Sequence, residues 1–133
     1  MKEMGKAHKV LVIDDDAGFI TAITPVLESR GYRVDAAYSK GEAAQKIVGF
    51  KPDLIVMDIM MERLTDGFDL CRELKRDPEL KATPILAVSA INKEIGMKFS
   101  PKTDGEYFQA DDFMEKPVSP ENLLERVEKL LKV

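Results

Sequence analysis

The sequence contains one cysteine and one histidine, and this scarcity excludes several kinds of site. Cys71 alone cannot form an intramolecular disulfide, which is consistent with a reducing compartment. His8 alone cannot supply a catalytic histidine dyad or a histidine-rich zinc site. No apolar run approaches the roughly 20 residues of a membrane-spanning helix, and no apolar segment of a secretory signal follows the basic N-terminus. We therefore expect a cytoplasmic protein that does not contact the membrane.

Basic residues are also in the minority, because 20 Lys and Arg face 24 Asp and Glu, for a net charge of -4. A nucleic-acid-binding domain would show clustered Lys and Arg, so we expect no direct contact with nucleic acid. The length of 133 residues and the hydrophobic fraction of 44% are typical of one globular domain with its own core. We place this domain at residues 8–133, preceded by a flexible segment at residues 1–7.

Short apolar runs alternate along the chain with segments of helical periodicity. The runs predict strands at residues 9–13, 32–36, 54–57, 85–88 and 112–115. The periodic segments predict helices from Asp16 to about Arg30, from Ser39 to Gly49, from Gly67 to Arg76, and after Ser119. Strands that alternate with helices indicate a parallel sheet covered on both faces.

Cap residues and apolar faces support these helices. Asp16 and Ser119 are suited to cap the first and last helices, and Ser39 with Glu42 has the spacing of a capping box. The first helix has an apolar face made of Phe19, Ile20, Ile23, Val26 and Leu27. The second has a narrower apolar stripe made of Ala43, Ala44, Ile47 and Val48. We expect these stripes to face the sheet.

Residues 90–110 are the least regular part of the chain. Gly96, Pro101 and Gly105 interrupt the helical pattern expected between the fourth and fifth strands. A small hairpin, an ordered loop and a helix all remain compatible with this segment.

Carboxylates follow two of the predicted strands directly. Asp14 and Asp15 end the first apolar run, and Asp58 ends the third. In an open parallel sheet, ligands bind outside the carboxyl ends of the strands, so these three side chains are expected to share one pocket. Grouped carboxylates repel one another unless a cation neutralises them, and Mg²⁺ prefers oxygen ligands of this kind. The sequence therefore predicts a magnesium site.

The same strand ends carry groups suited to phosphoryl transfer. An aspartate such as Asp58 is a competent nucleophile toward phosphorus, and a hydroxyl (Ser89) and an ammonium (Lys116) can neutralise the transferred group. Each residue alone has an ordinary explanation, as a turn former, a helix cap or a solvated surface lysine. Their joint occurrence at successive strand ends favours the functional interpretation.

In these motifs the sequence resembles the receiver domain of two-component response regulators. The matching segments are residues 12–16, 53–58, 66–67, 84–90 and 112–117, and the resemblance covers residues 8–133. It implies a single doubly wound, five-stranded parallel sheet of order 2-1-3-4-5, a flavodoxin-like α/β fold, with five helices. Here we expect the region of the fourth helix to be irregular.

The resemblance also implies a role for each site residue. Asp58 matches the phosphoacceptor, and Asp14 and Asp15 match the acidic pair that organises Mg²⁺, to which Met60 would add its backbone carbonyl. Ser89 matches the switch hydroxyl, Lys116 the lysine that pairs with the phosphoryl group, and Phe113 the aromatic switch residue. The implied donor is a histidine kinase or phosphotransfer protein, and the output is a switched partner-binding face acting on a downstream protein. The implied product is a signal, so we do not expect an enzyme in the ordinary sense.

Two departures from the family pattern keep an alternative open. The loop after Asp58 lacks the usual proline, and the segment between Ser89 and Lys116 is longer than usual, so residues 96–110 are expected to reshape the output face. These departures leave room for a pseudo-receiver, an interaction module that no longer uses phosphate. A phosphatase of the haloacid dehalogenase type is disfavoured because Asp14-Asp15-Asp16-Ala17-Gly18 lacks the threonine of that motif.

Overall fold

A computed structural model describes residues 7–58, 66–90 and 110–132. Five parallel strands form one sheet in the order β2-β1-β3-β4-β5. The strands are β1 (Lys9–Ile13), β2 (Arg33–Ala37), β3 (Leu54–Asp58), β4 (Ile85–Ala90) and β5 (Asp112–Lys116). The predicted doubly wound, flavodoxin-like α/β fold is confirmed.

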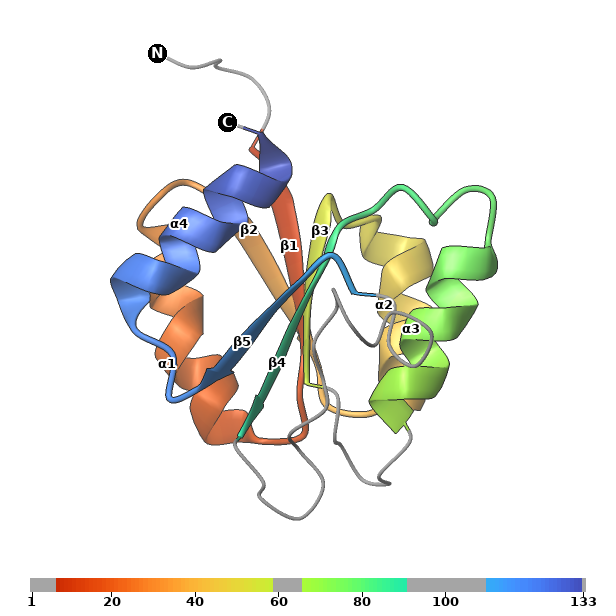
Figure 1. Ribbon diagram of the computed structural model, residues 1–133, viewed down its shortest axis with the longest axis horizontal. Coiled ribbons are helices and arrows are strands. Elements are labelled where there is room, and N and C mark those ends of the chain that lie inside the picture. Colours follow the sequence, from red (N-terminus) through yellow and green to blue (C-terminus); the bar gives the residue numbers. More distant parts are fainter. Residues whose placement is uncertain (1–6, 59–65, 91–109, 133) are drawn as a thin grey trace.

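Four helices are described, and they cover the sheet in pairs. They are α1 (Ala17–Glu28), α2 (Lys40–Phe50), α3 (Asp66–Arg76) and α4 (Pro120–Leu131). Helices α1 and α4 lie on one face of the sheet, and α2 and α3 lie on the other (Figure 1). The predictions for residues 90–110 fall almost wholly on residues 91–109, which lie outside the described part. None of the described helices has the length and apolar character needed to cross a bilayer.

Strand β1 shows how the two halves of the core are divided. Its successive side chains point to opposite faces, as in any strand. Val10 and Val12 belong to the cluster under α1 and α4, here the α1/α4 cluster, whereas Leu11 and Ile13 belong to the α2/α3 cluster on the other face. All four are fully buried. A strand buried on both faces reads as a continuous apolar run, which is why β1 and β3 were evident from the sequence.

The predicted starts of α1, α2 and α4 are confirmed, and α2 ends between Gly49 and Pro52, the two residues predicted to close it. Asp16 and Ser119 accept backbone N–H groups as caps, and Ser39 accepts the N–H of Glu42. Helix α2 continues through Gly49 to Phe50 and ends at Lys51, which adopts a left-handed conformation with φ of 53°. The N–H of Lys51 donates to the Ile47 carbonyl at 3.2 Å, so this carbonyl near the helix end is satisfied without the glycine that usually ends a helix.

The inner face of α2 also differs from the predicted stripe. Ala43 and Ile47 are buried, but Ala44 is exposed and Val48 is 72% exposed. Phe50, which lies near the end of the helix, packs against the α2/α3 cluster. The buried face of the helix is therefore narrower than the apolar stripe of the sequence, and Val48 lies outside this face.

An ion pair fastens α2 to β2. Lys46 Nζ lies 2.9 and 3.0 Å from the two carboxylate oxygens of Asp35. Burial by itself raises the pKa of Asp35, but hydrogen bonds from Lys46 and the Ala36 N–H, together with the lysine charge, lower it overall. The same hydrogen bond raises the pKa of Lys46.

A second polar contact joins α3 to the start of β5. Lys75 Nζ donates to Asp111 Oδ2 at 2.9 Å, to the Thr83 carbonyl at 3.0 Å and to the Lys81 carbonyl at 3.1 Å. Asp111 Oδ2 also accepts the N–H of Ile85 at 2.8 Å. The lysine side chain is only 15% exposed. Its ammonium therefore links, within a largely buried site, the backbone segments that lead into β4 and β5.

We expect Lys75→Met to lower the free energy of unfolding by about 2 kcal/mol, because three acceptors lose a charged donor. Urea unfolding monitored by circular dichroism measures this. Lys81→Met is the matched control, since it removes the same charge from an exposed side chain and should change stability by less than about 0.5 kcal/mol. Equal effects of the two substitutions would contradict the role assigned to Lys75.

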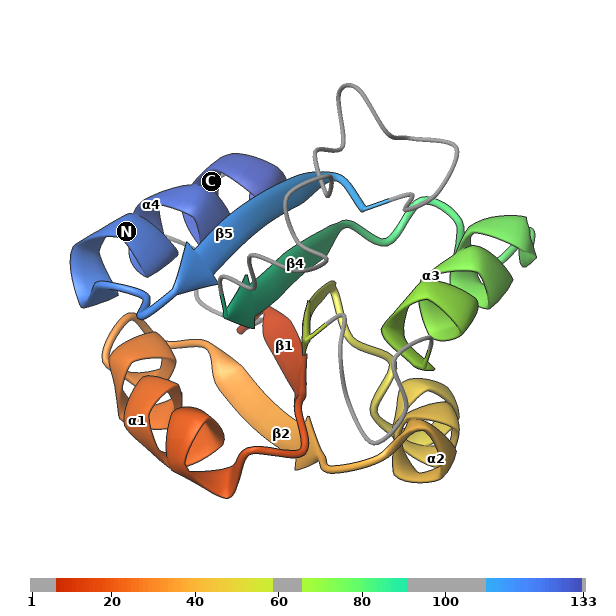
Figure 2. The same cartoon turned by 60° about the horizontal axis from the view of Figure 1, so that its bottom comes forward.

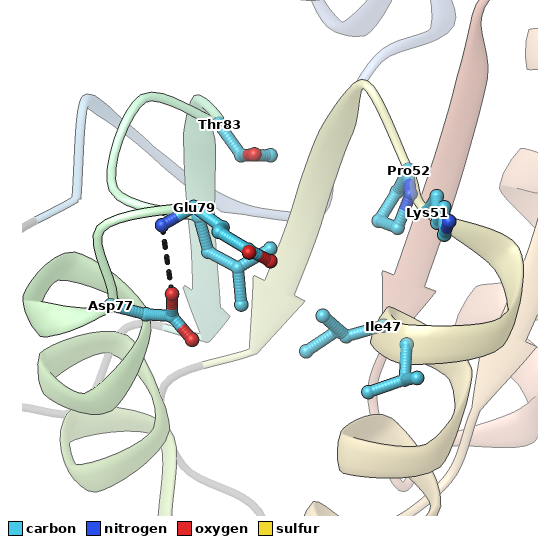
Figure 3. A pocket seen from close by; sticks show the side chains of 8 residues that line it. Ile47, Lys51, Pro52, Asp77, Glu79 and Thr83 are labelled. Atoms are coloured by element: carbon cyan, nitrogen blue, oxygen red, sulfur yellow. Dashed lines mark hydrogen bonds between the residues drawn. The ribbon is translucent and has the colours of Figure 1, made fainter.

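A groove of about 370 Å³ lies between α2 and the segment that leads into β4 (Figure 3). It is lined by Ile47, Val48, Lys51, Pro52, Asp77, Glu79, Leu80 and Thr83. Pro52 and Thr83 precede β3 and β4, so the groove lies toward the amino ends of these strands. It is thus at the opposite edge of the sheet from the acidic side chains.

Candidate functional site

The carboxyl ends of the strands gather at one edge of the sheet (Figure 2). Strand β1 ends at Ile13, which pairs with Met57 of β3, so Asp14 and Asp58 are each the next residue along two adjacent strands. Asp58 in turn pairs with Val88 of β4. Parallel register alone therefore brings the acids of the first and third strands together.

Asp14 is the most enclosed polar group of this edge. It is fully buried, and its N–H donates to the Ala37 carbonyl at 3.0 Å, which extends the pairing of β1 with β2. Its Oδ1 accepts the N–H of Asp16 at 2.9 Å, and its Oδ2 accepts Lys116 Nζ at 2.9 Å. Both oxygens are thus satisfied, as burial of a carboxylate requires.

Three carboxylates converge here. One oxygen from each of Asp14, Asp15 and Asp58 lies within 4.8 Å of the other two. Asp58 is 7% exposed, whereas Asp15 faces solvent and leaves the group open on one side. The donor set is entirely carboxylate oxygen, which hard divalent cations prefer, so the residues present fit a metal ion. The predicted proximity of these three carboxylates is confirmed.

Lys116 extends from the end of β5 into this acidic group. Its ammonium lies 2.9 Å from Asp14 Oδ2 and 3.9 Å from Asp58 Oδ2, and its side chain is 18% exposed. The formal charges of three carboxylates and one ammonium sum to -2. The lysine therefore offsets part of the repulsion among the three carboxylates, and a bound cation would offset more of it.

The structure describes the other predicted site residues only in part. Ser89 pairs through its backbone with Glu115 of β5, one residue beyond the partner of Asp58, but its side chain lies outside the described part. Phe113 is half-buried against the α2/α3 cluster. Met60 also lies outside the described residues, so the loop departure noted after Asp58 stays a prediction.

The sequence reasoning assigned Phe19 to the core face of α1 and missed its contact with the site. The Phe19 ring packs partly on the α1/α4 cluster, but Lys116 Nζ lies 4.4 Å from the ring centroid. An aromatic residue in the first turn of a helix that follows an acidic strand end was the available signal. Its spacing alone could not distinguish a core contact from a contact with a cation.

The comparisons with known proteins agree with this geometry. Residues 10–128 match the family model described as the response regulator receiver domain. The alkaline phosphatase synthesis transcriptional regulatory protein PhoP of Bacillus subtilis (strain 168) is 37% identical over 124 residues, which are 93% of this chain and 48% of that protein. The chain spans about half the length of the curated relatives it matches.

Two solved structures extend the match to the fold. The response regulator (signal receiver domain) from Bermanella marisrubri is 30% identical, covers 95% of this chain and 99% of its own, and superposes with a TM-score of 0.78. The chemotaxis response regulator CheY4 of Vibrio cholerae is 28% identical over 94% of this chain and 99% of its own, with a TM-score of 0.79. This chain belongs to the receiver domain family of the response regulators of two-component systems.

Proposed function

We propose that this receiver domain takes a phosphoryl group on the carboxylate of Asp58 from a histidine kinase or a phosphotransfer protein. The observation that carries the proposal is the convergence of Asp14, Asp15 and Asp58 within 4.8 Å, with Lys116 Nζ 2.9 Å from Asp14 and 3.9 Å from Asp58. Such a set combines a nucleophile with groups that neutralise a dianionic phosphoryl group, which is what phosphoryl transfer requires.

Asp58 supplies the attacking oxygen. It forms a bond to phosphorus as the bond between phosphorus and the donor nitrogen breaks, and the electron pair of that bond stays with the donor. Asp14 and Asp15, with Asp58, would hold Mg²⁺, and Met60 would contribute its backbone carbonyl. When bound, magnesium would offset the negative charge on the oxygens of the transferred phosphoryl group.

Lys116 and Ser89 act on the transferred group once it is attached. The ammonium of Lys116 offsets its charge, and the hydroxyl of Ser89 donates a hydrogen bond to it. Phe113 moves with Ser89 and transmits the change to a partner-binding face. The product is a signal to a downstream protein, so the domain acts as a cytoplasmic switch rather than as an enzyme, without contacting nucleic acid or membrane itself.

The test is the intact mass after incubation with acetyl phosphate and Mg²⁺. We expect the mass of one phosphoryl group to be gained by the unmodified chain and by Asp53→Asn, but not by Asp58→Asn. Asp53 is the matched control because it lies at the opposite end of the same strand and accepts the N–H of Lys9 at 2.8 Å. A chelator should abolish the gain.

Two results would contradict this function. Phosphoryl uptake by Asp58→Asn would place the acceptor elsewhere. No uptake from either acetyl phosphate or a phosphorylated histidine protein would leave the pseudo-receiver, an interaction module that does not use phosphate.

A further inference from the structure

Lys116 makes a contact that neither the acidic group nor the charge balance requires. Its ammonium lies over the face of the Phe19 ring, 4.4 Å from the centroid. A cation over an aromatic face is attracted by the negative charge of that face, and the attraction strengthens when the cation is shielded from water. The lysine side chain is only 18% exposed, so this contact belongs to the stronger class.

The same short segment places both Phe19 and Asp14. Asp16 donates its N–H to Asp14 Oδ1 at 2.9 Å, and its own Oδ1 accepts the N–H groups of Gly18 at 2.9 Å and Phe19 at 3.2 Å. The ring and the buried carboxylate are thus tied through one cap residue. The Lys116 ammonium contacts both groups, the Asp14 carboxylate through a hydrogen bond and the Phe19 ring through its face.

We propose that Phe19 is a positioning residue, whose ring holds the Lys116 ammonium beside Asp58 so that it is in place for the phosphoryl group. The inference rests on the proposed function. A lysine ammonium has three N–H donors, of which one bonds to Asp14 Oδ2. The ring face attracts the charge of the ammonium and does not require a directed hydrogen bond from it. The ring therefore restrains a side chain with four rotatable bonds while leaving donors available for phosphoryl oxygens.

A packing role for Phe19 must be separated from this electrostatic one, because the ring also contacts the α1/α4 cluster. Substitution by leucine would alter both. Fluorination of the ring separates them, since each added fluorine withdraws electron density from the ring face and weakens its attraction for a cation. The shape is nearly kept and the apolar character rises, so packing is maintained.

The experiment places phenylalanine with one, two or three fluorine atoms at position 19. The rate of phosphorylation of Asp58 is then measured with acetyl phosphate and Mg²⁺. We expect the rate to fall stepwise with each fluorine, by about three- to tenfold over the series, as expected for the loss of one shielded cation–π contact. The urea unfolding midpoint should not fall along the series.

Phe50 provides the matched control within the same chain. Its ring also lies near cations, 5.8 Å from Lys9 Nζ and 6.0 Å from the Arg33 guanidinium carbon, but at the opposite edge of the sheet. Fluorination at position 50 should leave the phosphorylation rate unchanged. In a Lys116→Met background, fluorination at position 19 should also have no effect.

The outcomes separate this inference from the function on which it rests. A flat series at position 19, in a chain that takes up phosphoryl groups normally, overturns the role of Phe19 alone. Equal slowing at positions 19 and 50, or slowing that persists without Lys116, overturns it as well. If the unmodified chain takes up no phosphoryl group from any donor, the proposed function fails and the inference fails with it.

Discussion

Replacing Lys116 by methionine is expected to lower the free energy of unfolding by about 3 kcal/mol when no divalent cation is present. Asp14 is fully buried, and Lys116 Nζ at 2.9 Å is the cation on its Oδ2. Methionine keeps most of the aliphatic length but leaves the carboxylate charge uncompensated. Urea unfolding in the presence of a chelator measures the loss.

Magnesium should then restore more stability to Lys116→Met than to the unmodified chain. The ammonium and the cation draw on the same carboxylate oxygens, so removing the first leaves more attraction for the second, and a ligand that binds only the folded state stabilises it. The readout is the difference in urea midpoint with and without Mg²⁺.

Two controls separate the pairing of Asp14 from a general charge effect. Lys129→Met removes the same charge from an exposed side chain of α4 and should change stability by less than about 0.5 kcal/mol. In a double-mutant cycle, Asp14→Asn should recover much of the stability lost in Lys116→Met. A loss that persists in the double variant would show that the buried charge is not its cause.

Ile47→Ala is expected to destabilise the protein by about 3 kcal/mol, whereas Val48→Ala, its neighbour on α2, should change the free energy of unfolding by less than about 0.5 kcal/mol. Ile47 is 4% exposed and belongs to the α2/α3 cluster, so truncation leaves a cavity. Val48 is 72% exposed, and alanine is the better helix former. Chemical unfolding of the two variants side by side is the measurement.

This pair discriminates between two placements of α2. The helical stripe read from the sequence treats both residues as buried, whereas the structure buries only one. A loss of more than about 1 kcal/mol for Val48→Ala would mean that the helix is rotated toward that side. Similar small losses for both would mean that α2 contributes little to the core.

The fold could be predicted because each level of the sequence points to the same answer. The apolar runs of β1 and β3 are continuous since both faces of those strands are covered, and the cap residues Asp16, Ser39 and Ser119 mark the helix starts. The exact ends of the helices follow less directly from the sequence. Gly49 lies inside α2, and the left-handed residue that ends this helix is Lys51.

The acidic group could also be predicted, because parallel strands bring their carboxyl ends to one edge whatever side chains surround them. The ion-pair partner of each charged side chain could not be predicted. The contact of Lys116 with Asp14 joins residues 102 positions apart, and that of Lys75 with Asp111 joins residues 36 apart. Such pairs depend on how helices and strands are placed on one another, which no local pattern contains.

The sequence by itself determined a parallel sheet covered by helices on both faces, the starts of its helices and the edge at which Asp14, Asp15 and Asp58 meet. These follow from local periodicity, cap chemistry and the parallel direction of the strands, all of which act over short distances along the chain. Only the tertiary structure decided that Lys116 lies between two carboxylates and an aromatic ring, and that Val48 faces solvent. The physical reason is that burial and charge pairing depend on the angle and position at which each element packs, and these are set by the whole core together.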